Sequence, residues 1–283
     1  MRPFAAAHPG GDAVVSMLVV MSLGSAGGAD RWFESATPTA GGAEVFVFPY
    51  AGGIAASFTP WQEAAPPELS VRVAQLPARG VRLHEPPVDD LTELVAELTT
   101  AVTERASGPF LLFGHSLGAL VAFEVTRELR RRGGPDPLAL LVSGAEGPQT
   151  RRVARRCHEL DDTDLIEALR DFGVTSAALL ADRELMELIL PGIRADFALS
   201  ERYAYRPGPP LELPVHVLLG DRDEHVDPDR AAGWARDCAA PPRVHVYAGG
   251  HFFLAEHRSE ILDLMRRIVT CHTAPAHTAT KDR

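Results

Sequence analysis

Cysteine is scarce in this sequence, which has three in 283 residues: Cys157, Cys238 and Cys271. No two of them have the spacing of a disulfide pair, and no Cys/His cluster has the spacing of zinc ligands. A secreted disulfide framework and a zinc module are therefore disfavoured. We expect three free thiols in a cytoplasmic protein, and no metal site.

Positive charge is also in deficit. Lysine and arginine number 28 against 38 acidic residues, which gives a formal net charge of -10. A general nucleic-acid-binding protein needs clustered positive charge, so this class is disfavoured. The chain is 46% hydrophobic and 23% charged, which is typical of a globular protein with a full core. Its length fits one large domain or a domain with an insertion.

The apolar run at residues 13–23, AVVSMLVVMSL, is too short to span a bilayer. With the small residues that follow, it imitates a signal peptide. Only Arg2 supplies positive charge before it, however, and Asp12 abuts it. We expect residues 1–29 to be a disordered extension and expect no membrane association; secretion is the alternative.

From residue 44 onward, short apolar and β-branched runs alternate with helical patterns. Such runs are typical of buried parallel strands. Repeated strand–helix units predict an α/β fold with a doubly wound, mostly parallel sheet. We predict strands at 44–48, 71–76, 109–114, 138–144, 215–220 and 243–249, and helices at 89–106, 117–132, 229–238 and 256–269.

Residues 145–214 interrupt this alternation. They contain no convincing strand but two helical stretches, 161–173 and 182–205, and Pro191 predicts a kink or a split in the second. A helical insertion on the side of the functional loops is either a lid over a pocket or a structural cap without a gating role. The sequence does not choose between them.

The pentapeptide GHSLG at residues 114–118 lies between a predicted strand and a predicted helix. Gly-x-Ser-x-Gly is weak by itself, but this setting is that of a nucleophile elbow. The glycines remove side chains that would clash in the tight turn, so Ser116 projects above the sheet. The helix N-terminus favours negative charge near the Leu117 amide. We predict that Ser116 is a nucleophile.

Two later loops offer an acid and a base. LLGDRDEHV supplies Asp221 or Asp223 after one strand, and VYAGGH places His251 after the last strand. The order Ser, Asp, His is that of α/β-hydrolases. Glu146 is a weaker candidate for the acid. Among the other histidines, His245 is expected to be a sheet residue, and His225 and His257 are expected to be solvated.

The segment FPYAGG, residues 48–53, follows the first predicted strand. A backbone amide in it can pair with the Leu117 amide as an oxyanion hole.

Six stretches between about Asp30 and Val269 match one known family: DRWF (30–33), FPYAGGIAASF (48–58), QLPARGVRLHEPP (75–87), FGHSLGALVAFEVTREL (113–129), LPGIRADFALSERY (190–203) and GGHFFL (249–254). In these stretches the sequence resembles the type II thioesterases, the stand-alone editing enzymes of polyketide and nonribosomal peptide assembly lines. One position departs from the family pattern: Ala78 stands where the family usually has glycine.

The resemblance implies an α/β-hydrolase fold with a helical lid, and it assigns the site. The family's Gly-x-x-Asp spacing, counted from Gly220, selects Asp223 as the acid. The oxyanion amides are implied to be those of Ala51 and Leu117, with the Tyr50 amide one residue away. The domain is expected to span residues 30–270, with a lid at about 145–214 and a flexible tail at 271–283.

The implied substrate is a stalled or mis-primed acyl group on the phosphopantetheine arm of an acyl or peptidyl carrier protein. It would be hydrolysed through an acyl-Ser116 intermediate with no cofactor. The same triad hydrolyses oxoesters, so a carboxylesterase or lipase is the alternative. A non-catalytic relative of this fold is disfavoured, because no triad member is missing.

Two further features concern the acyl chain and the carrier. Leu185, Leu188 and Leu190 either shape an acyl pocket or merely pack the lid helix. The arginine clusters at 130–132 and 151–156 either meet an acidic carrier protein or are solvated faces. A monomer is expected.

Overall fold

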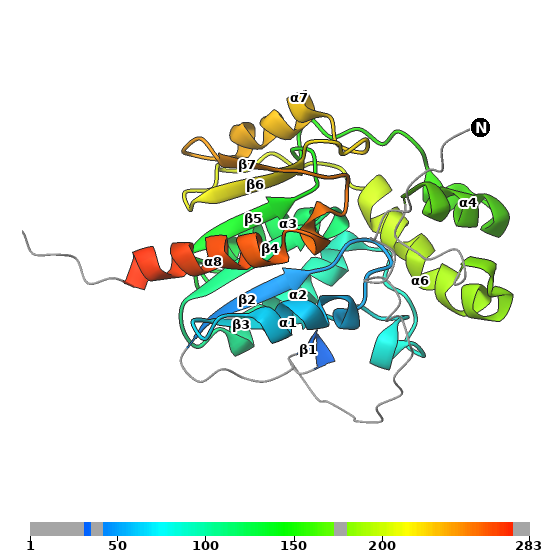
Figure 1. Cartoon of the computed structure of the whole chain (residues 1–283), viewed down its shortest axis with the longest axis horizontal. Coiled ribbons are helices and arrows are strands. Elements are labelled where there is room, and N and C mark those ends of the chain that lie inside the picture. The colour runs from blue at the N-terminus through cyan, green and yellow to red at the C-terminus, as the bar shows by residue number, and fades with distance from the viewer. Residues whose placement is uncertain (1–30, 35–41, 173–179, 274–283) are drawn as a thin grey trace, which may run out of the picture.

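The computed structural model describes residues 31–34, 42–172 and 180–273 (Figure 1). In this part of the chain, seven strands form one sheet in the order β1-β3-β2-β4-β5-β6-β7, and all neighbouring strands except β1 and β3 are parallel. The mostly parallel α/β sheet and its six predicted strands are confirmed. The strands are β1 (Phe33–Glu34), β2 (Ala43–Phe48), β3 (Leu69–Ala74), β4 (Phe110–His115), β5 (Ala139–Ser143), β6 (Val215–Gly220) and β7 (Arg243–Tyr247).

The sequence did not predict β1. This strand has two residues and pairs antiparallel to β3, with Phe33 opposite Ala74. Two residues are too few for a periodic pattern, so only the pairing with β3 identifies the strand. Its aromatic side chain nevertheless belongs to the core, since the Phe33 ring lies 4.9 Å from that of Phe46.

Alternate residues of the strands form two apolar layers, one on each face of the sheet. Phe46 and Phe48 face a layer that also contains α2 and α3, whereas Val45 and Val47 face a layer that contains α8. Figure 1 shows α8 lying across one face of the sheet. The covering helices are α1 (Thr59–Ala64), α2 (Leu91–Arg105), α3 (Leu117–Arg131), α7 (Pro228–Ala231) and α8 (Arg258–Thr273).

The insertion contains α4 (Asp162–Phe172) and α6 (Arg183–Glu201), which lie beyond the carboxyl ends of the strands (Figure 1). We call these two helices the lid. They share an apolar cluster of their own, separate from the two layers of the sheet. A kink or a split was predicted at Pro191; the split is wrong, because α6 continues through this residue. Proline removes one hydrogen bond of the helix, and the buried side chains of Leu190 and Ile193 hold the helix together on either side.

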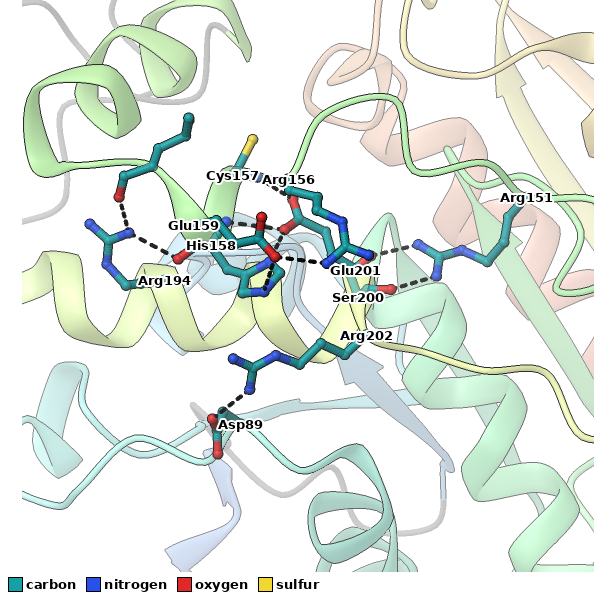
Figure 2. A network of polar contacts seen from close by, with 11 residues as sticks. Asp89, Arg151, Arg156, Cys157, His158, Glu159, Arg194, Ser200, Glu201 and Arg202 are labelled. Atoms are coloured by element: carbon teal, nitrogen blue, oxygen red, sulfur yellow. Dashed lines mark hydrogen bonds and ion pairs between the residues drawn. The ribbon is translucent and has the colours of Figure 1, made fainter.

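The base of the lid is fixed by polar contacts around Glu201, the last residue of α6 (Figure 2). The Glu201 carboxylate accepts hydrogen bonds from the amides of Cys157 and His158, at 2.8 and 3.0 Å, and from the His158 ring. On the next residue, Arg202 donates to Asp89 at 3.0 Å. These contacts tie the end of α6 both to the segment that enters the lid and to the body of the domain.

The chain is described as far as the end of α8 at Thr273, so this helix includes the first three residues of the segment expected to be a tail. Residues 1–29 and 274–283 lie outside the described residues. The three cysteines are free. Within the described ranges, no helix is long and apolar enough to cross a membrane, and no group of three His, Cys, Asp or Glu side chains is arranged to hold a metal ion.

Candidate active site

Ser116 lies in a strained turn between β4 and α3. Its φ is 55°, in the left-handed region that non-glycine residues rarely adopt. A Cβ on Gly114 would lie 1.9 Å from the Gly118 oxygen, and a Cβ on Gly118 would lie 1.9 Å from the Phe48 oxygen. The turn therefore needs both glycines, for the steric reason that the sequence indicated. Observed strain of this kind is frequent at functional sites.

His251 and Asp223 contact each other at the same edge of the sheet. The His251 Nδ1 lies 2.8 Å from the Asp223 Oδ2, and both side chains are buried. The His225 amide donates to Asp223 Oδ1 at 2.9 Å. Burial alone would raise the pKa of Asp223, but the hydrogen bonds from His251 and His225 outweigh it and lower that pKa. Asp223 is thus an ionised partner that orients the imidazole.

The other acid candidates lie elsewhere. Asp221 is half exposed and accepts the Gly249 amide at 2.7 Å, so it fastens the loop that precedes His251. Glu146 accepts the amides of Arg152 and Asp227. No contact joins either carboxylate to His251 among the described residues.

His251 lies beside the Ser116 turn. Its ring centroid is 5.0 Å from that of His115, the residue that precedes Ser116. The contacts of the described residues include no hydrogen bond between the Ser116 hydroxyl and His251. Three loops, after β4, β6 and β7, thus place Ser116, Asp223 and His251 at one edge of the sheet.

His115 is a neighbour of the site that the sequence did not single out. It is fully buried, and its Nδ1 lies 2.9 Å from the Ser143 hydroxyl. Burial lowers the pKa of His115 well below its ordinary value, and the charge of His251 acts in the same direction. The ring is therefore neutral. Gly-x-Ser-x-Gly leaves this position open, so the motif carried no signal for it.

The loop of residues 49–53 after β2 carries the candidate oxyanion amides. The Gly53 amide donates to the Tyr50 oxygen at 2.8 Å, and the Gly52 amide donates to Asp196 Oδ2 of the lid at 2.7 Å. The amides of Tyr50 and Ala51 have no acceptor among the contacts of the described residues. Leu117 is the first residue of α3, where helix amides lack intrahelical acceptors.

Two of the remaining histidines have partners that the sequence did not indicate. The His225 ring is exposed, yet it stacks on Phe172 of the lid at 4.4 Å and meets the His251 ring edge-on at 5.2 Å. The His257 ring contacts Glu260 and the Ala248 oxygen, and the Glu260 carboxylate raises the pKa of His257. His245 lies within β7, where its ring pairs with His216 at 3.0 Å.

The three lid leucines lie in different surroundings. Leu190 is buried in the apolar cluster of the lid, and Leu185 packs against that cluster. Leu188 is 47% exposed. Besides Asp196, Ile193 of the lid meets the loop of residues 49–53, since its Cγ1 would lie 3.3 Å from a Cβ on Gly52. The sequence gave Ile193 no role.

Most of the clustered arginines already have partners within the chain. Arg130 donates to the oxygens of Pro209 and Pro210, and Arg131 and Arg132 donate to Glu128. In the second cluster, Arg151 binds Ser200 and Arg156 binds Glu159, as Figure 2 shows, and Arg155 lies 4.0 Å from Asp171. Only the Arg152 side chain has no partner among the described residues.

Comparisons with known proteins agree with this architecture. A thioesterase-domain family model matches residues 43–269. The chain is 33% identical to the gramicidin S biosynthesis protein GrsT of Aneurinibacillus migulanus, over 87% of this chain and 96% of GrsT. It is 37% identical to thioesterase PikA5 of Streptomyces venezuelae, over 80% of this chain and 81% of PikA5.

A solved structure shows the same likeness. The type II thioesterase BorB from the borrelidin biosynthetic cluster superposes with a TM-score of 0.79 at 36% identity, covering 86% of this chain and all of BorB. The predicted α/β-hydrolase fold is confirmed by this neighbour. The chain belongs to the thioesterase family, among its type II enzymes.

Proposed function

We propose that Ser116, His251 and Asp223 form a catalytic triad that hydrolyses acyl thioesters. The observation that carries this proposal is the buried 2.8 Å contact between His251 Nδ1 and Asp223 Oδ2 beside the strained Ser116 turn. With Nδ1–H donated to Asp223, Nε2 is the ring atom free to accept the serine proton. The order of the three residues in the chain is that of α/β-hydrolases.

In the acylation step, His251 takes the Ser116 proton while Oγ attacks the thioester carbonyl carbon. The amides of Ala51 and Leu117 stabilise the oxyanion, and one donor of this kind contributes about 3 kcal/mol in other enzymes. The carbon–sulfur bond then breaks, and His251 gives the proton to the departing thiolate. The products of this step are acyl-Ser116 and a free thiol.

In the deacylation step, His251 takes a proton from water, and the resulting hydroxide attacks acyl-Ser116. The carbon–Oγ bond breaks, Ser116 regains its proton from His251, and the free acid leaves. Both steps are redox-neutral proton and acyl transfers. We therefore propose that the enzyme uses no cofactor of its own.

We further propose that the acyl group arrives on the phosphopantetheine arm of an acyl or peptidyl carrier protein. The support comes from the relatives: GrsT is named for gramicidin S biosynthesis, and BorB comes from the borrelidin cluster. A stalled or mis-primed acyl group is the expected substrate, and its carrier binds transiently. The alternative is a carboxylesterase that acts on oxoesters, because a triad alone does not select the leaving group.

The experiment compares the same short acyl groups on a carrier protein, on N-acetylcysteamine and as oxoesters. Remote binding energy from the carrier can be used in the transition state. We expect kcat/KM to be highest for the carrier-bound thioester and lowest for the oxoester. Equal values for all three would favour the esterase. Ser116→Ala serves as the inactive control on every substrate.

A further inference from the structure

Asp196 of α6 is a buried carboxylate that reaches from the lid to the loop of residues 49–53. Its side chain is 1% exposed. Oδ2 accepts the Gly52 amide at 2.7 Å and also a hydrogen bond from Arg79 Nη1, while Oδ1 accepts Arg79 Nη2 at 2.7 Å. All of these donors lie outside the lid, more than a hundred residues earlier in the chain.

Arg79 completes a bridge between the lid and the same loop. It is also buried, and besides Asp196 it donates to the oxygens of Gly53 and Gly192, each at 3.4 Å. The Gln75 side chain holds the Arg79 backbone, since it donates to the Arg79 oxygen at 3.0 Å. The same side chain accepts the Ala55 amide at 2.8 Å. The guanidinium thus contacts the loop and the lid helix at once.

The bridge restricts how the loop can present its amides. Asp196 occupies the Gly52 amide, and the Tyr50 oxygen occupies that of Gly53. Gly52 has a φ of +75°, so the chain turns sharply directly after Ala51. The Gly52 amide belongs to the Ala51–Gly52 peptide, and the Tyr50 oxygen belongs to the same peptide as the Ala51 amide. The hydrogen bond to Asp196 and the Gly53–Tyr50 hydrogen bond therefore fix two successive peptides, the first of which carries the Ala51 amide.

A buried ion pair is a costly way to gain stability alone, because desolvation of both charges opposes their attraction. Its geometric effect here is specific, because both charges meet at the lid and both contact the loop of residues 49–53. We propose that Asp196 and Arg79 are positioning residues for the oxyanion amide of Ala51. Through them, the seating of the lid helix sets the geometry of the oxyanion hole. This inference rests on the proposed function.

The test replaces the pair together, as Arg79→Met/Asp196→Leu, so that no unpaired charge stays buried. The substrate is an acyl-N-acetylcysteamine thioester, which removes any effect of carrier docking. A misplaced oxyanion donor stabilises the transition state less, while the binding of the ground-state substrate changes little. We expect kcat to fall by about 10²-fold while KM changes by less than about threefold. Affinity for an alkyl boronic acid, whose adduct with Ser116 has an oxygen in the oxyanion hole, should fall with kcat.

The matched control is Arg72→Met/Glu44→Leu. That pair also joins distant parts of the chain and is largely buried, but it links β2 to β3 at the end of β2 away from the site. It should change thermal stability and leave kcat within about twofold. Should the first double variant fail to fold, Arg79→Lys, which keeps the charge but loses the bidentate contact, should show the same fall in kcat at constant KM.

Three outcomes would overturn the inference: unchanged kcat in a folded variant, equal losses of kcat in the control, or a fall in kcat with full boronate affinity. These outcomes all presuppose an active wild type. Failure of the wild type to hydrolyse the thioester or to bind the boronate at Ser116 would instead contradict the proposed function.

Discussion

Two loops at the same edge of the sheet are held in place in different ways. The Ser116 turn is shaped by its own neighbours, because Gly114 and Gly118 allow the backbone to approach within distances that any Cβ would prevent. The loop of residues 49–53 instead donates its Gly52 amide to Asp196, which lies 144 residues away. The nucleophile is thus positioned locally, and the proposed oxyanion hole is positioned by the lid.

The largest effect is expected at the turn itself. Ser116→Ala and His251→Ala should each lower kcat by about 10⁶-fold, because nucleophile and base act as one unit. Steady-state hydrolysis of a thioester measures both. Ser116→Ala should leave the fold unchanged, since the Ser116 hydroxyl makes no hydrogen bond among the described residues. His251→Ala removes the partner of the buried Asp223 carboxylate, so its thermal unfolding is measured alongside its activity. A variant that kept a tenth of the activity would remove that residue from the mechanism.

The choice of acid is tested next. Asp223→Asn should lower kcat by about 10⁴-fold, because the amide cannot hold the imidazole in the required tautomer. Asp221→Asn is the matched control. Its carboxylate accepts the Gly249 amide and does not contact His251, so its effect should be less than tenfold. The reverse order of the two effects would make Asp221 the acid.

Alanine substitutions at two glycines, one in each loop, test the two loops separately through their effect on stability. Gly118→Ala should destabilise the protein by at least about 3 kcal/mol, because its Cβ would meet the backbone oxygen of Phe48 at 1.9 Å. Gly52→Ala should cost about 1–2 kcal/mol, because its φ is positive but its nearest neighbour is the movable side chain of Ile193. Urea denaturation measures both. Equal costs would contradict the claim that the Ser116 turn depends on close backbone contacts that the loop of residues 49–53 does not have.

The contrast between local and long-range contacts also explains which features could be predicted from the sequence. The six parallel strands and the Ser116 turn follow from apolar runs and local glycine spacing. Asp223 could be chosen over Asp221 only through the family resemblance, because both follow β6 at positions of similar chemistry. Asp196, Ile193 and His115 lie in stretches that resemble the family, but the sequence assigned none of them a role. Their roles depend on contacts between segments that only the folded chain brings together.

The smallest expected effect concerns Ala78, which stands where glycine is usual in the family and has a φ of 60°. The left-handed backbone conformation destabilises alanine in the folded state. Glycine adopts it without this cost, although glycine loses more conformational entropy on folding. Ala78→Gly should therefore stabilise the protein by about 0.5–1 kcal/mol. Ala78 lies next to Arg79, so kcat also reports whether the bridge to Asp196 is kept. We expect the bridge to stay intact and kcat to be unchanged. A loss of stability in the thermal unfolding curve would show that the alanine side chain stabilises this loop.

The most direct test of the account identifies the serine that becomes acylated. Ser116 lies beside His251, but Ser143 also contacts a histidine, since its hydroxyl lies 2.9 Å from His115 Nδ1. Both members of that second pair are fully buried. An alkyl fluorophosphonate should label the protein once, and peptide mapping by mass spectrometry should place the adduct on Ser116. The Ser116→Ala variant should remain unlabelled. An adduct on Ser143, or undiminished labelling of the Ser116→Ala variant, would contradict the account.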